Sequence, residues 1–175
     1  MHEIFELVDA DDASGVRELL AREPAAVQER DESGLSPLAR ALYRGNSAAF
    51  EAVRDTVPPT DPWDRVLAGE ADGLPEPDAW SVDGFTPLHL AAFAHNAAAA
   101  RALLEAGANP DTVARSSFAR VTPLGTCAFA NAAEVARVLL EHGADPSIAE
   151  DDRSTPVAVA EANGYAELVE VLRAP

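Results

Sequence analysis

The chain has 175 residues, of which 47% are hydrophobic, and its 30 acidic and 13 basic residues give a net charge of −17 at pH 7. This apolar share is enough for a folded core and excludes wholesale disorder, while the acidity argues against nucleic acid or an anionic membrane surface as a partner. The single cysteine, Cys127, excludes a framework of internal disulfides.

The N-terminal third is predicted to hold two units, each made of two short helices. Apolar residues at helical spacing place the first pair near residues 4–8 and 16–20, within a capping unit over residues 1–30. The second unit, residues 31–56, opens with Ser36-Pro37-Leu38, because serine caps a helix and proline suits its first turn.

Residues 57–80 interrupt this pattern. The segment contains Pro58-Pro59-Thr60-Asp61-Pro62, a short helical stretch from Trp63 to Leu67, and Pro75-Glu76-Pro77. We predict a shortened, degenerate unit here. The alternative is a long irregular insertion, which a compact domain seldom carries without a role.

Three further units are predicted over residues 81–113, 114–149 and 150–175. The first of them reads Asp-Gly-Phe-Thr-Pro-Leu-His-Leu-Ala-Ala from Asp83 and closes with Leu-Leu-Glu-Ala-Gly-Ala-Asn-Pro-Asp. A weaker copy begins at Thr122-Pro123-Leu124 and a third opening at Thr155-Pro156-Val157. Recurrence of this kind indicates stacked two-helix units.

These motifs resemble the ankyrin repeat, and the chain is similar to a small ankyrin-repeat protein of the bacterial type. The resemblance implies an all-α solenoid of five to six helix-turn-helix units, forming one domain over residues 1–175. It also implies that His89, in Thr-Pro-Leu-His, ties neighbouring repeats together by hydrogen bonds. At the equivalent positions the chain has Ala39, Gly125 and Ala158, so those steps are expected to lose the bridge.

In ankyrin repeats the concave surface is formed by hairpin tips and by the exposed part of each first helix. Mapped onto this chain, the resemblance predicts a partner-binding surface with an aromatic patch centred on Phe93 and Phe129. The full set of candidate residues is Tyr43, Arg44, Asp83, Phe85, Phe93, Phe118, Phe129, Asp151 and Asp152. The alternative is that these phenylalanines pack against each other and against the next hairpin.

The sequence contains no pattern typical of catalysis. Its four histidines lack metal-ligand spacing, and Cys127 is expected to be a buried, unreactive thiol. The run Asp9, Asp11, Asp12 departs from a calcium loop, and a helix-opening turn explains it better. We therefore expect a protein that is not an enzyme and that uses no cofactor and no metal.

We predict a non-enzymatic scaffold that binds a partner protein or peptide on its concave face, as a monomer. One alternative is a small-molecule-binding or catalytic accessory role in an aromatic crevice near Trp63 and Trp80, and another is a self-associating structural subunit. The N-terminus lacks a basic segment followed by an apolar run, which favours a cytoplasmic protein. Heavy use of alanine, arginine and proline without lysine suggests a bacterial source.

Overall fold

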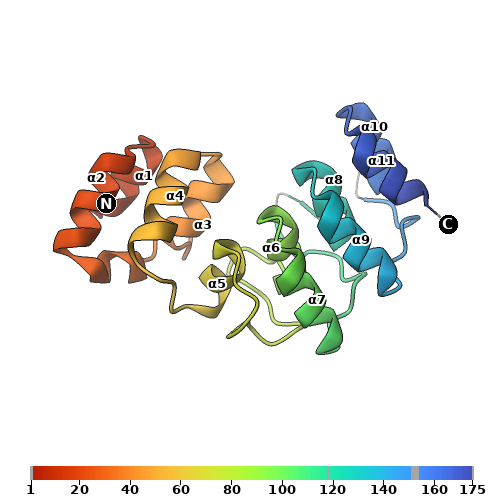
Figure 1. The fold of residues 1–175 in the computed structure, drawn as a ribbon, viewed down its shortest axis with the longest axis horizontal. Coiled ribbons are helices and arrows are strands. Elements are labelled where there is room, and N and C mark those ends of the chain that lie inside the picture. Colours follow the sequence, from red (N-terminus) through yellow and green to blue (C-terminus); the bar gives the residue numbers. More distant parts are fainter. Residues whose placement is uncertain (1, 118, 151–153, 175) are drawn as a thin grey trace.

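The computed structural model describes residues 2–117, 119–150 and 154–174, and all regular secondary structure in these ranges is helical (Figure 1). The elements are α1 (Glu3–Asp9), α2 (Ala13–Arg22), the 3₁₀ helix η1 (Pro24–Gln28), α3 (Pro37–Arg44), α4 (Ser47–Thr56), α5 (Pro62–Ala68), α6 (Pro87–Phe93), α7 (Ala97–Glu105), α8 (Pro123–Ala130), α9 (Ala133–Glu141), α10 (Pro156–Ala162) and α11 (Ala166–Arg173). The predicted all-α solenoid is confirmed.

The helices form two rows along the stack. First helices pack on first helices, as α6 does on α8 and α8 on α10, and second helices pack on second helices, as α7 does on α9 and α9 on α11. Each helix therefore buries its apolar face against its own partner and against the neighbouring units, the arrangement expected of a solenoid.

Helix starts follow from the residues predicted to cap them. Ser36, Thr122 and Thr155 each accept a hydrogen bond from the backbone N–H three residues later, at 3.1, 3.1 and 3.4 Å. In each case a proline occupies the first helical position, where its missing N–H costs nothing.

Alanine sets the thickness of the core. Ala91, Ala92, Ala99 and Ala100 on α6 and α7 are fully buried. Such small side chains let helix backbones approach closely, while larger residues such as Leu103 fill the space between units.

Residues 57–80 contain a single helix, α5, and no second helix follows it before α6. The Asn96 side-chain amide donates to Val66 O at 3.0 Å and to Glu70 O at 2.7 Å, at the end of α5. Asn46 makes the same type of bond to Val8 O, at the end of α1, at 2.8 Å. By this contact α5 occupies the place of a first helix, and its unit lacks the second helix that would stand between α4 and α7.

Candidate partner-binding site

Hairpin-like turns precede the first helices and form a row of loop tips. Each turn is closed by a backbone hydrogen bond, from Asp31 N to Leu35 O at 3.0 Å, from Ser81 N to Phe85 O at 2.9 Å, and from Ala114 N to Val121 O at 2.8 Å. Successive tips also touch, because Arg115 N donates to Gly84 O at 2.8 Å.

The row of tips runs past α5 without a gap. A methyl group placed on Gly34, at the tip before α3, would lie 3.5 Å from the Val82 side chain, at the tip before α6. The unit that contains α5 has no tip of its own between these two. The tips before α3 and α6 are therefore direct neighbours on this face, although α5 lies between these helices in the stack.

A groove of about 650 Å³ lies along these tips and is lined in part by Leu35, Tyr43, Trp80, Val82 and Arg115. The Val82 side chain is 71% exposed within it. The Arg115 guanidinium lies 4.0 Å from the centre of the Trp80 ring, a favourable cation–π contact. Apolar and aromatic groups thus line a concave surface that solvent reaches.

Three aromatic rings join α3 to α6. Tyr43 lies 6.4 Å from Phe85 and 5.6 Å from Phe93, and Phe85 and Phe93 are 5.3 Å apart in an edge-to-face contact. Phe85 is completely buried. Its predicted role as a direct partner contact is therefore wrong: Phe85 packs beneath the surface and supports the half-buried rings of Tyr43 and Phe93.

The predicted patch centred on Phe93 and Phe129 does not form as one ring cluster among the described residues. Phe93 packs with Tyr43 and Phe85, whereas Phe129 on α8 is 51% exposed and has no ring contact within the described ranges. The candidate residues Phe118, Asp151 and Asp152 lie outside the described residues.

Two charged candidates are engaged within the protein. Arg44 on α3 is about half exposed and pairs with Asp9 at 3.0 Å. The Oδ1 atom of Asp83 accepts a short hydrogen bond from the Ser81 hydroxyl, within the tip before α6. Asp83 thus shapes the turn and faces the groove at the same time.

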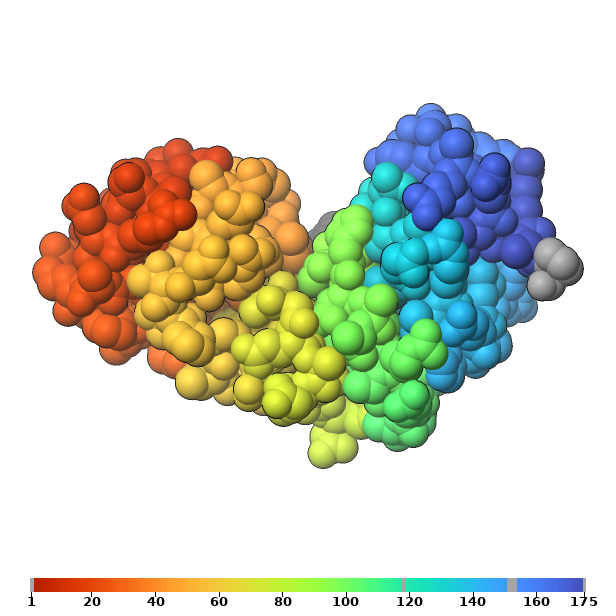
Figure 2. Space-filling view, viewed as in Figure 1, coloured from red at the N-terminus to blue at the C-terminus, as the bar shows by residue number. Residues whose placement is uncertain are grey.

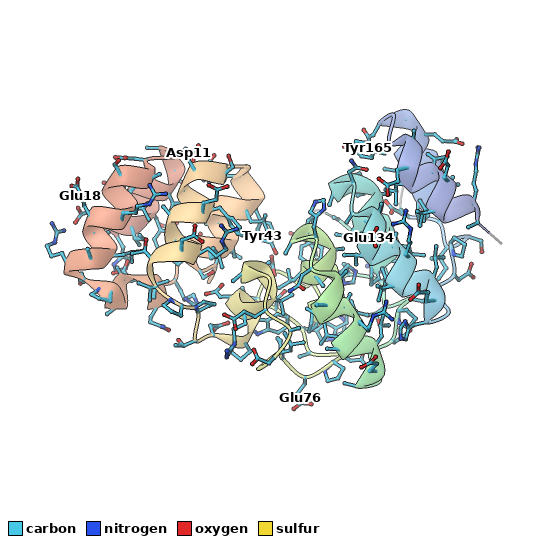
Figure 3. All side chains as sticks on the ribbon, in the orientation of Figure 1. Asp11, Glu18, Tyr43, Glu76, Glu134 and Tyr165 are labelled. Atoms are coloured by element: carbon cyan, nitrogen blue, oxygen red, sulfur yellow. The ribbon has the colours of Figure 1, made fainter. Side chains whose placement is uncertain are left out.

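A second hollow, of about 390 Å³, opens between α3 and α6 and is lined by Leu42, Tyr43, Phe93, His95 and Ala130. Figure 2 shows the notch between the two halves of the stack, and Figure 3 places Tyr43 at its edge. The notch exists because α5 alone fills the space between α3 and α6.

A crevice of about 260 Å³ lies between α3, α5 and α6, and both Trp63 and Trp80 line it. Its most buried charged residue is Asp64, on α5, which is 6% exposed. The Ser36 hydroxyl donates to Asp64 Oδ1 at 2.5 Å. The pKa of Asp64 is raised to about 6. Burial is the main cause, and it outweighs the lowering of the pKa by the hydrogen bond from Ser36.

Asp64 was missed by the sequence analysis, although a signal for it exists. It stands three residues before Leu67, on the same face of the predicted helical stretch, and Leu67 is buried. A carboxylate at helical spacing from a core leucine points toward the interior rather than toward solvent.

His89 forms the bridge that the resemblance implied. Its Nε2 lies 2.9 Å from Val121 O in the next unit, so Nε2 carries the proton, and Nδ1 accepts from the backbone N–H and the hydroxyl of Thr86. Burial lowers the pKa of His89 to about 4, which keeps the ring neutral. The residue is structural and has no free nitrogen for chemistry.

At the equivalent position in the next unit, Gly125 leaves room that another side chain fills. A Cβ atom at Gly125 would collide with the carboxylate of Glu150, which belongs to the following loop. The histidine bridge is absent at this step, as expected, but the space that it would occupy is not empty.

The remaining candidates for chemistry serve the fold. Asp9 pairs with Arg40 at 2.6 Å, Asp11 accepts from Ala49 N at 2.7 Å, and Asp12 caps α2. Cys127 is fully buried, and burial raises the pKa of its thiol. Within the described ranges, no group of three histidine, cysteine or acidic side chains could hold a metal ion, and no helix is long and apolar enough to cross a membrane.

Comparison with known proteins agrees with this geometry. The family model for the ankyrin repeat matches residues 83–115 and 120–151. The human Neurogenic locus notch homolog protein 4 is 42% identical over 85 residues, which are 47% of this chain and 4% of that protein. The chain contains ankyrin repeats over residues 83–115 and 120–151, and it spans only a small part of the relative that it matches. Ankyrin repeats generally mediate protein–protein interactions.

Proposed function

We propose that this protein is a non-catalytic scaffold that binds a partner protein or peptide across its row of loop tips. The observation that carries the proposal is the groove along the tips before α3, α6 and α8, with Val82 71% exposed in it. An exposed apolar side chain in a concave, aromatic-lined surface is typical of an interaction site.

The candidate binding residues divide by position. Tyr43, Val82 and Asp83 face the groove, Phe93 reaches the notch between α3 and α6, and Phe129 is exposed on α8. We propose that the partner contacts these residues in that order along the stack. Phe85 would hold the rings of Tyr43 and Phe93 in place from below.

We further propose that the protein acts as a cytoplasmic monomer. Its net charge of −17 disfavours association with a second copy through self-repulsion. A reduced, buried Cys127 is compatible with a reducing compartment.

A capture experiment with single-charge variants tests the proposal. Val82→Glu and Phe129→Glu each place one charge on the proposed surface, and Ala98→Glu places the same charge on the exposed side of α7. A protein that wild type and Ala98→Glu capture from lysate, and that Val82→Glu loses, would support the site. Equal capture by all three folded variants would contradict it.

The crevice between Trp63 and Trp80 is the specific observation behind a second candidate function, the binding of a small molecule. At about 260 Å³, the crevice is smaller than the roughly 300–1,000 Å³ typical of sites for drug-sized ligands. We therefore rank this function second. Thermal-shift screening of small amines and aromatic metabolites tests it, and a shift that depends on Trp63 would support it.

A further inference from the structure

The crevice between α3, α5 and α6 adjoins the groove along the loop tips. Leu35, Tyr43, Trp80, Val82 and Asp83 line both. A chain lying across the tips would therefore pass over the mouth of the crevice. The crevice is deep enough to be lined by Leu67 and Leu90 from two helices, so a side chain of that partner could enter it.

The charges that line the crevice do not balance. Asp61, Asp64 and Asp83 contribute three carboxylates, and Arg30 contributes one guanidinium, which pairs with Asp61 at 3.0 Å. Among the described residues neither Asp64 nor Asp83 forms a salt bridge, and Arg30 acts on Asp64 through its charge alone. Two carboxylates of this kind favour a cation as the missing partner.

The hydrogen bonds of the Asp83 carboxylate are also incomplete. Ser36 satisfies Asp64 Oδ1, and Ser81 satisfies Asp83 Oδ1. Asp83 Oδ2 is buried, and no donor among the described residues meets hydrogen-bonding geometry there. Burial first, then the charge of Asp83 and a hydrogen-bonding contact with its carboxylate, raise the pKa of the Tyr43 phenol. The phenol therefore lies beside Asp83 without meeting the full geometry of a hydrogen bond at Oδ2. An unsatisfied buried acceptor beside a cavity requires a physical explanation.

The walls of the crevice suit a flat cation. Trp63 and Trp80 present indole rings, and Trp80 already stacks against the guanidinium of Arg115 at 4.0 Å on the groove side. Guanidinium groups are weakly hydrated, stack on aromatic faces and bind carboxylates through a rigid fork of donors. The small volume fits one side chain rather than an extended cofactor.

We propose that this crevice receives an arginine side chain of the partner that lies across the loop tips, held by Asp64 and Asp83 between the two tryptophans. The proposal rests on the proposed scaffold function and deepens it. The guanidinium would complete the hydrogen bonds of both carboxylates and balance their charge, and the neighbouring backbone of the partner would follow the tips.

Tryptophan fluorescence provides a direct test, because the chain has two tryptophans and both line the crevice. The probes are the capped peptides acetyl-Gly-Arg-Gly-amide, its lysine and citrulline analogues, and methylguanidinium. We expect saturable binding of the arginine peptide, with citrulline at least tenfold weaker because it lacks the charge. Asp64→Asn should weaken the arginine peptide at least tenfold, while Glu76→Gln, which makes the same change in net charge at an exposed loop, should leave it unchanged.

A pH series separates recognition by Asp64 from general electrostatics. The charged groups facing Asp64 are Asp61, Arg30 and Asp83, with Ser36 as its hydrogen-bond donor. Affinity for the arginine peptide should rise from pH 5 to pH 7.5 in wild type, as Asp64 ionises, and this rise should shrink in Asp64→Asn.

Several outcomes would overturn the proposal. Equal binding of the arginine and citrulline peptides, or equal effects of Asp64→Asn and Glu76→Gln, would show that the crevice does not select a cation. Equal affinity for the lysine and arginine peptides would show that the crevice does not select a guanidinium group. If methylguanidinium bound as tightly as the arginine peptide, the crevice would be a small-molecule site. If no peptide bound while Val82→Glu still abolished partner capture, the scaffold function would stand and the arginine pocket would fall.

Discussion

The step from α6 to α8 is a regular repeat junction, whereas the step from α3 to α6 has to accommodate α5 alone. At the regular step the buried polar group, His89, is neutral and bonded through both ring nitrogens. At the irregular step the buried polar group, Asp64, is an acid with a raised pKa beside a crevice. Where the repeat keeps its pattern, the buried polar group bridges two units. Where the pattern breaks, the buried acid faces a crevice, and we propose that this crevice is open to a partner.

The largest expected effect is at the regular junction. His89→Ala removes the bond to Val121 O and leaves the Thr86 groups without their acceptor. Because these groups are buried, we expect a loss of about 3 kcal/mol in the free energy of unfolding. Urea denaturation followed by circular dichroism measures it, and Ala39→Gly at the equivalent position of the second unit is the comparison. A loss below about 1 kcal/mol would contradict the bridge.

His89 also predicts a dependence of stability on pH. Its pKa is lowered from 6.5 to about 4 in the folded protein, so the unfolded chain binds more protons between these values. The contribution of His89 to stability is therefore complete above pH 6.5 and is lost as the pH falls toward 4. Melting temperatures of wild type and His89→Ala should converge over that range.

The anchoring of α5 should be the next most costly to remove. Asn96→Ala deletes the bonds to Val66 O and Glu70 O and the cap on Ala99 N, and we expect a loss of about 2 kcal/mol. In Asn96→Ala, the rate of amide hydrogen exchange should increase more in α5 than in α8. Uniform acceleration over the whole chain would contradict a local role.

Asp64→Asn should stabilise the protein at neutral pH. The folded pKa of Asp64 is about 6 against an ordinary value of 3.8, so the folded state favours the protonated form and ionisation costs stability as the pH rises through 6. Allowing for water in the crevice, we expect a gain of about 1.5 kcal/mol at pH 7.5 and none below pH 4. Urea titrations at both pH values test the sign.

The smallest effect concerns the glycine that replaces the bridging histidine. Helix propensity alone predicts that Gly125→Ala stabilises by roughly 1 kcal/mol. Because the new methyl group would displace the Glu150 carboxylate, we expect Gly125→Ala to destabilise by about 1 kcal/mol instead. In the background of Glu150→Ala, Gly125→Ala should stabilise the protein as helix propensity predicts. Strictly additive effects of the two substitutions would refute the clash between the new methyl group and the Glu150 carboxylate.

The sequence predicted the regular part of the molecule well, for reasons that particular residues make clear. Thr86, Thr122 and Thr155 each precede a proline, and this local chemistry starts a helix wherever it occurs. The bridge from His89 to the next unit also followed from its motif. Local patterns of this kind carry their own structural meaning, so the helices could be placed before any tertiary contact was known.

The candidate site was predicted less completely, because it depends on contacts between units. Phe85 and Phe93 fall in the same unit, whereas Tyr43 comes from α3, which α5 separates from α6 along the chain, and it meets both rings only in the folded stack. The burial of Asp64 depends in the same way on α3 and α6 closing over α5. Spacing along the chain does not encode that closure.

The direct contact between the tips at Gly34 and Val82 has a consequence for how such a protein can change over time. In a regular solenoid each repeat supplies both helices and a tip, so the two rows of helices and the row of tips keep the same count. Here the helical stack contains a unit with one helix, while the row of loop tips stays continuous. Insertions or deletions near α5 can therefore alter the helical stack without changing the row of loop tips, provided that these two tips remain neighbours.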